Sequence, residues 1–248
     1  MIKHLTFLLT IVALLFSTNV EAQKLKGLLN KAKEVVQNEG IGGAKLSKEE
    51  IGKGLKEALN IGVGEAVDFL SVEDGYLKSP YKILMPEEAE KVMSKLRVVP
   101  GFSNVEKDII EKINRAAEDA ATKAKPIFVS AIKQMTFNDA TNILLGEKDA
   151  ATRFLENSTY DQLYSEFKPV IIASLDKFKA RETWKKAITA HNKLPFVKKA
   201  NPELDDYVAK QALIGMFSLV EEKEENIRGN VDARPSALLQ KVFAKQDN

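Results

Sequence analysis

The sequence predicts an all-α protein: one bundle-like, multi-helix domain with capped short helices, following a cleaved signal peptide. Apolar residues recur at helical spacing along residues 114–169, and a helix start or stop signal stands at nearly every junction of that stretch. The chain is 44% apolar over 248 residues, which is enough to bury a sizeable core. It contains no cysteine, so no disulfide can hold the fold. Packing between helices must therefore hold the domain together.

Residues 1–22 have the three parts of a secretory signal peptide. Residues 1–4 are short and basic, and residues 5–16 are apolar but shorter than the about 20 residues that a bilayer-spanning helix needs. Small side chains then precede Gln23, which predicts cleavage after Ala22. We expect an exported protein that is periplasmic or secreted. Without cysteine, a lipoprotein anchor is excluded.

Residues 23–46 predict a flexible, basic, amphipathic arm. Leucine, alanine and valine recur at helical spacing there, and lysines fill the positions between them. Such a helix can touch anionic lipid, so residues 24–36 are candidates for peripheral membrane contact. The alternative is an arm that is mobile or docks loosely on the domain. Gly40, Gly42 and Gly43 break the pattern and predict a hinge.

The all-helical domain is expected to span residues 47–248 as one unit, since no Pro/Gly/Ser-rich linker divides it. Ser47 and Glu50 form a capping-box pattern that predicts the start of its first helix. Gly62 and Gly64 lie within that helix. Because glycine weakens a helix, we expect another backbone to pass close to both. Turn dipeptides then predict a loop over residues 75–86.

The next helices are separated by capping residues and proline. Ser103 with Glu106 predicts the start of a helix whose apolar stripe narrows to alanine before Pro126. Pro126 marks a kink or the first turn of another helix. Two further capping patterns predict helix starts: Thr136 with Asp139, and Thr159 with Gln162.

The last third of the chain continues the helical pattern. Pro169 precedes apolar positions that define a further helix, and residues 201–203 read Asn-Pro-Glu, a strong helix start. Residues 209–220 are apolar almost all round, which predicts a central, buried helix. The acidic residues 221–225 are expected to carry that helix into water, and Gly229 to end it. A small closing helix follows.

Several motifs in this chain resemble those of a known family. They are Asn114-Arg115-Ala116-Ala117-Glu118, Ala124-Lys125-Pro126-Ile127-Phe128, Asp149-Ala150-Ala151-Thr152, Leu194-Pro195-Phe196-Val197 and Leu204-Asp205-Asp206-Tyr207-Val208. In order and spacing, from about Leu55 to the C-terminus, the sequence is similar to the bacterial exported family catalogued as domain of unknown function 4197. This resemblance implies an all-helical envelope protein with no assigned activity. Two positions depart from the expected pattern: Ile214 stands where a polar residue is expected, and Val231 where proline is expected.

The composition excludes several classes of function. Lys and Arg total 37 against 35 Asp and Glu, and a net charge of +2 gives no basic footprint for nucleic acid. There is no cysteine nucleophile, and His191 is the only histidine after the signal peptide. Near a helix end, the helix dipole favours a histidine without any catalytic partner. One histidine and no cysteine also rule out the usual zinc sites. The sequence therefore points to no catalytic residue, metal or cofactor.

Three polar residues are the main candidates for a ligand or partner site. Asn114, Arg115 and Glu118 are spaced to share one edge of a helix whose other face is alanine. Arg115 with Glu118 could hold a polar ligand or the carboxylate of a partner. The alternative is a structural pair that fixes how helices dock. Weaker candidates in the same region are Lys125, Asp139 and Tyr160.

Three functions remain open at this point. The first is a non-catalytic binding or structural component of the cell envelope, whose partner is an unknown envelope protein. The second is a carrier that holds a lipid or other apolar ligand between its helices. The third is a hydrolase with a polar site near Asn114. A dry apolar cavity wider than one side chain would favour the carrier, whereas convergence of Arg115, Glu118 and His191 would favour the enzyme. With neither, binding through the surface remains.

Overall fold

The computed structural model describes residues 46–86, 89–90, 104–177, 179–193, 195–196 and 198–247. The chain divides into two units, Met1–Ser47 and Lys48–Asn248, and every helix discussed below belongs to the second. The predicted signal peptide and all but the last residue of the predicted arm lie outside the described residues. Cleavage near Ala22 and membrane contact through residues 24–36 therefore stay predictions.

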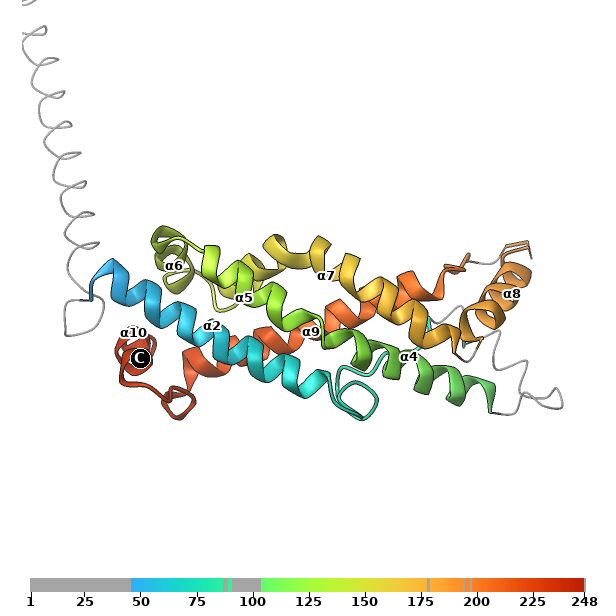
Figure 1. The fold of residues 1–248 in the computed structure, drawn as a ribbon, viewed down its shortest axis with the longest axis horizontal. Helices are drawn as coiled ribbons and strands as arrows, with labels where there is room; N and C mark the ends of the chain where they lie inside the picture. The colour runs from blue at the N-terminus through green and yellow to red at the C-terminus, as the bar shows by residue number, and fades with distance from the viewer. Residues whose placement is uncertain are drawn as a thin grey trace, which may run out of the picture. The chain divides into compact units, whose positions relative to one another are not determined.

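The described residues form helices and connecting loops without a strand, which confirms the predicted all-α fold (Figure 1). None of these helices combines the length and the apolar character that crossing a bilayer requires. The helices, in chain order, are α2 Lys48–Leu70, α4 Val105–Ala121, α5 Ala124–Gln134, α6 Phe137–Leu144, α7 Ala150–Asp176, α8 Ala180–Asn192, α9 Leu204–Gly229, the 3-10 turn η1 Val231–Ala233, α10 Ala237–Phe243 and the 3-10 turn η2 Ala244–Gln246.

Helix α9 is the central helix of the bundle. It packs against α2, α4, α7 and α8, and Figure 1 shows it crossing the middle of the bundle. Its apolar side chains are buried on several sides, as the sequence predicted for residues 209–220. Phe217 meets Phe128 of α5 edge-to-face, with ring centroids 5.8 Å apart, a favoured geometry for aromatic pairs. The core is therefore assembled around α9.

Helix α7 does not break where the sequence predicted. Thr159 lies in its interior, where its hydroxyl donates to the carbonyl of Leu155 at 2.6 Å instead of capping a new helix. Pro169 also lies inside α7. Proline frees the carbonyl four residues earlier, and Ser165 at that position is exposed, so water can satisfy it. The break comes later, before α8, where Lys179 adopts a left-handed conformation with φ 53°.

Close approaches to α2 occur at other glycines than those predicted. A Cβ placed on Gly54 would lie 2.6 Å from Cγ2 of Val242 in α10, and one on Gly52 would meet the ring of Phe137. A Cβ on Gly62 would lie 3.4 Å from Cβ of Lys223, an ordinary contact, and one on Gly64 would meet nothing within 4 Å. Gly54 and Gly52 thus let α10 and the start of α6, respectively, approach α2 closely.

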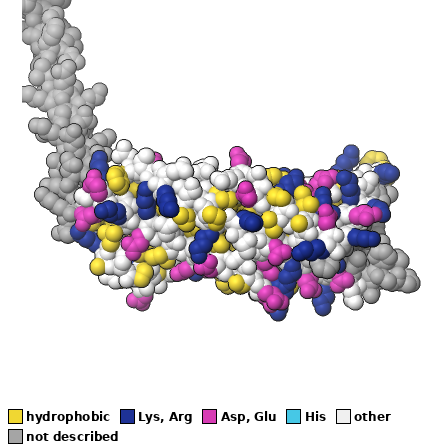
Figure 2. Space-filling model, viewed as in Figure 1, with side chains coloured by type: hydrophobic (Ala, Val, Ile, Leu, Met, Phe, Trp, Pro, Cys, Tyr) yellow, Lys and Arg dark blue, Asp and Glu magenta, His cyan; other side chains and the backbone are white. Residues whose placement is uncertain are grey.

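Other predicted boundaries hold. Thr136 and Asp139 form the capping box at the start of α6, and Gly229 is the last residue of α9. Pro126 lies in the first turn of α5. For α4, Ser103 lies outside the described residues, and the N-cap Asn104 makes no side-chain cap bond. The surface in Figure 2 carries basic and acidic side chains interspersed, in keeping with the small net charge.

Candidate functional site

Both polar atoms of the Asn114 side chain form hydrogen bonds within the domain. It is 0% exposed, and its Oδ1 accepts a hydrogen bond from the Ile83 N–H at 2.8 Å. Its Nδ2 donates to the carbonyls of Ile83 at 2.8 Å and Ile110 at 2.7 Å. The amide therefore ties the loop before residue 86 to α4, as a backbone partner would in a sheet.

Glu118 and Arg115 hold the earlier part of the same loop. Glu118 is 4% exposed, and its Oε1 accepts from the Tyr76 N–H at 3.1 Å and the Leu77 N–H at 3.2 Å. Its Oε2 accepts from Arg115 at 2.8 Å, and the other end of that guanidinium donates to Asp74 at 2.7 Å. The hydrogen bond to Glu118 is the main reason that the pKa of Arg115 is raised. The side chains of the three main candidates thus lie close together, and each binds the loop of residues 74–83.

Tyr76, which the sequence did not single out, belongs to the loop that Glu118 and Arg115 hold. Its ring is fully buried and packs on Gly215 of α9, where an added Cβ would come within 3.0 Å of the ring. Its hydroxyl donates to the Ala212 carbonyl at 2.7 Å. Burial, reinforced by the charge of Glu118, raises the pKa of the phenol. The loop is therefore anchored to both α4 and α9.

The other three candidates lie elsewhere in the bundle. Lys125 of α5 pairs with Asp68 of α2 at 2.9 Å, and both side chains are exposed. Asp139 belongs to the capping box of α6. Tyr160 lies half-buried on α7, near enough to Lys210 of α9 to contribute to its raised pKa. His191 lies in α8, outside the residues whose side chains the structure describes. The six candidates do not form one site.

Glu224 corrects the sequence interpretation of residues 221–225 as a solvated end, because it is only 8% exposed. Its carboxylate accepts from the N–H groups of Ala151 at 3.0 Å and Thr152 at 2.7 Å, at the start of α7. Arg228 donates to Glu224 at 2.9 Å and to the carbonyls of Ile143 at 2.9 Å and Leu144 at 3.3 Å, at the end of α6. Their spacing of four residues on a buried helix face is the signal that could have revealed the pair.

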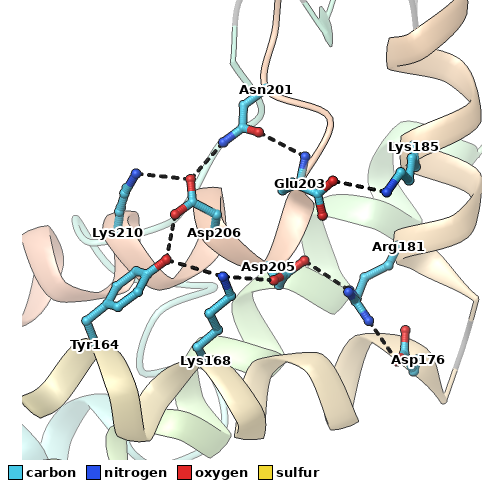
Figure 3. A network of polar contacts seen from close by, with 10 residues as sticks. All are labelled: Tyr164, Lys168, Asp176, Arg181, Lys185, Asn201, Glu203, Asp205, Asp206 and Lys210. Carbon is cyan, nitrogen blue, oxygen red and sulfur yellow. Dashed lines mark hydrogen bonds and ion pairs between the residues drawn. The ribbon is translucent and has the colours of Figure 1, made fainter.

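A second polar network joins α7, α8 and α9 (Figure 3). Asp205 is buried and binds Arg181 at 3.0 Å, with Lys168 at 3.7 Å. Asp206 accepts from the Tyr164 hydroxyl at 2.6 Å, and this hydrogen bond raises the pKa of Tyr164. Every acid drawn in Figure 3 has a polar partner there, so the network ties the three helices together.

A groove between α5 and α7, among the described residues, has a volume of about 200 Å³. A smaller, apolar cavity of about 20 Å³ lies between α2, α9 and α10 and has room for about one water molecule. The groove takes residues from one face of each flanking helix and from the start of α6. Its lining is Ile127, Ser130, Ala131, Gln134, Met135, Asp139, Phe154, Ser158, Thr159 and Gln162.

Comparison with known proteins places the chain in a family. The family model described as protein of unknown function (DUF4197) matches residues 45–244. The chain belongs to the DUF4197 family. Neither the curated proteins nor the solved structures gave a match. The DUF4197 match covers every described α-helix and all residues that line the groove.

The two positions at which the sequence is expected to depart from the family pattern fall on the surface. Ile214 of α9 is 57% exposed, and Val231 of η1 is 47% exposed. Because neither side chain enters the core, the helical packing does not depend on them. In the described residues, no group of three histidine, cysteine, aspartate or glutamate side chains is placed to hold a metal ion.

Proposed function

We propose that this DUF4197 protein is a non-catalytic binding protein of the cell envelope, and that it binds its ligand in the groove between α5 and α7. The observation that carries the proposal is the groove itself. It offers about 200 Å³ beside several polar side chains. Concave sites that combine apolar walls with a few polar groups are the usual place for ligands.

The geometry gives less support to a carrier. A lipid chain needs a dry space wider than one side chain, whereas the apolar cavity of about 20 Å³ admits about one water molecule. Its walls include the Glu224–Arg228 pair, which caps two helices. Enlarging this cavity would therefore break contacts that hold α6 and α7 in place.

A hydrolase centred on Asn114 is also less well supported. The amide of Asn114 and both carboxylate oxygens of Glu118 are engaged by loop backbone or by Arg115. A general base must reach a substrate proton at hydrogen-bond distance, and here that would mean releasing the loop. Binding without catalysis asks for no such change.

Location in the envelope is the part of the proposal that rests on the sequence. Residues 1–22 have the pattern of a signal peptide, and the arm that follows is basic and amphipathic. The occupant of the groove would then be a molecule or a protein side chain of the envelope. Cell fractionation of the untagged chain tests this part, because a protein retained in the cytoplasm would contradict it.

Binding in the groove is tested by nuclear magnetic resonance on the full chain with a library of small fragments. Ala131→Trp fills the groove, while Ala173→Trp adds the same bulk at an exposed position on α7. We expect fragments to shift the amide signals of groove residues in the wild type and in Ala173→Trp, but not in Ala131→Trp. Shifts that persist unchanged in Ala131→Trp, or fragments that bind only elsewhere, would overturn the proposal.

A further inference from the structure

We infer that the groove between α5 and α7 selects a primary ammonium group carried on an aliphatic chain. This inference rests on the proposed function and names the ligand class of the same site. It follows from three properties of the lining: which polar atoms are left open, where the only charge lies, and what forms the walls.

The two hydroxyls of the α7 wall act as hydrogen-bond acceptors toward the groove, while the Gln162 amide beside them can both donate and accept. The Ser158 hydroxyl donates to the Phe154 carbonyl at 2.8 Å, and the Thr159 hydroxyl donates to the Leu155 carbonyl at 2.6 Å. A hydroxyl has one proton to give and two lone pairs. With their protons committed to the helix, both oxygens have only lone pairs left for a ligand. These two hydroxyls therefore favour a ligand that donates, and the Gln162 amide can accept from the same ligand.

Asp139 supplies the only charge among the lining residues. Its Oδ2 accepts from the Thr136 N–H at 2.9 Å and the Thr136 hydroxyl at 2.7 Å, which leaves Oδ1 outside the capping box. These bonds lower the pKa of the carboxyl, so it is ionised at neutral pH. None of the ten lining residues is basic. A cation in the groove would thus meet a carboxylate that no lining side chain neutralises.

The remaining walls suit an aliphatic chain. Ile127 and Met135 are buried beneath the groove, and Ala131 and Phe154 line its sides. Phe154 also carries an aromatic ring, whose face can attract a cation. A volume of about 200 Å³ is below the roughly 300–1,000 Å³ of sites for drug-sized ligands. The groove therefore fits a short chain, which a free alkylamine or the lysine side chain of a partner protein would each supply.

Other ligand classes fit less well. A carboxylate or phosphate would approach Asp139 with no lining cation to offset the repulsion, which disfavours anions. A neutral alcohol can donate only one hydrogen bond and leaves the charge of Asp139 without a counterion. An ammonium group donates three hydrogen bonds and carries the opposite charge.

The test measures binding of matched probes to the full chain by titration of the groove amide signals. Pentylamine, pentanoate and 1-pentanol share an unbranched five-carbon skeleton and differ in the head group, and a capped Gly-Lys-Gly peptide presents the ammonium as a side chain. We expect pentylamine or the peptide to bind at least about tenfold more tightly than pentanoate or pentanol. The tighter of the two identifies the source, a free amine or a protein lysine.

Two variants separate the charge of Asp139 from its capping role. Asp139→Asn removes the charge and keeps an oxygen that can accept from the Thr136 N–H, so pentylamine affinity should fall about tenfold or more. Thr136→Ala weakens the cap but keeps the carboxylate, so affinity should change less than about twofold. Pentanol or pentanoate binding as tightly as the tighter of the two ammonium probes, or equal affinity of that probe for Asp139→Asn, would overturn the inference and leave the groove function standing. If no probe shifts a groove signal, the inference fails, and the fragment screen decides whether the groove binds any ligand.

Discussion

Glu224 and Arg228, one helical turn apart on α9, cap opposite ends of two other helices. Glu224 accepts hydrogen bonds from the first backbone N–H groups of α7, and Arg228 donates to the last carbonyls of α6. Each helix end would otherwise leave buried polar groups without partners. The two side chains also bind each other at 2.9 Å. One ion pair thus joins three helices, and losing either member strands a buried charge.

Glu224→Gln is expected to destabilise the fold by about 3 kcal/mol, since removing one partner of a buried ion pair leaves the other uncompensated. Urea denaturation followed by circular dichroism measures the free energy of unfolding. Glu225→Gln is the matched control, because Glu225 binds exposed Lys148 and should contribute less than about 1 kcal/mol. A loss below about 1 kcal/mol in Glu224→Gln would show that water replaces its contacts.

Asn114→Asp should cost about 3 kcal/mol, because the amide both donates to and accepts from the backbone of Ile83. A carboxylate cannot donate, and it would face two carbonyl oxygens in a buried place. Asn60→Asp, on the exposed face of α2, serves as the control and should cost little. Thermal unfolding of both variants gives the comparison. If Asn114→Asp were as stable as the wild type, the loop around Ile83 would detach from α4 without loss of stability.

The glycines of α2 should respond in opposite directions. Gly62→Ala is expected to stabilise the fold by about 0.5–1 kcal/mol, since the new Cβ meets Lys223 at an ordinary 3.4 Å and alanine favours the helix. Gly54→Ala should destabilise it by about 1–3 kcal/mol, because Val242 lies 2.6 Å from the added atom. The change in the denaturation midpoint of each variant, relative to the wild type, measures the two effects. Two changes of the same sign would contradict the packing of α10 on α2.

The stability of the fold should fall at high pH partly through Tyr76. Burial raises the pKa of this phenol above the about 10 of an unfolded chain. Below a pH of about 10, Tyr76 is protonated in both the folded and the unfolded protein, and its contribution to the free energy of unfolding is fully present. Above it the unfolded state loses the proton first, so the free energy of unfolding decreases by about 1.4 kcal/mol per pH unit.

Denaturation of the wild type and Tyr76→Phe between pH of about 9 and 11 checks this dependence. The variant lacks the titrating group, so its free energy of unfolding should fall less steeply above pH of about 10. Lysine deprotonation affects both proteins alike and cancels in the comparison. Parallel curves would show that Tyr76 ionises in the folded state as easily as in the unfolded one.

The helical fold could be predicted because apolar residues recur at helical spacing within short stretches of the sequence. Boundaries were harder where one residue type serves two purposes. Thr159 can cap a helix or bond back within one, and Pro169 is tolerated where the freed carbonyl faces water. Tertiary packing decides between these uses. The same holds for Gly54, whose close neighbour Val242 comes from the far end of the chain.

The candidate site was less predictable because its partners are not side chains with a recognisable spacing. Asn114 and Glu118 could be singled out as polar residues on an alanine-rich helix. Apart from Arg115 and the Ile110 carbonyl, their partners are backbone atoms of a loop, at 31 positions from Asn114 and 42 or 41 from Glu118, which carry no sequence signal. Apart from Asp139 of α6, which was a candidate, the groove is built from neutral residues of α5, its C-cap and α7.

The contact of α10 with α2 bears on the order of events after synthesis. Lys241 binds Glu50 across 191 positions, next to the place where Val242 meets Gly54. A nascent chain cannot close this seam until its final helix has left the ribosome, and long-range contacts of this kind form slowly. A chain truncated before α10 would expose the part of α2 that α10 covers, making it a target for proteases and chaperones.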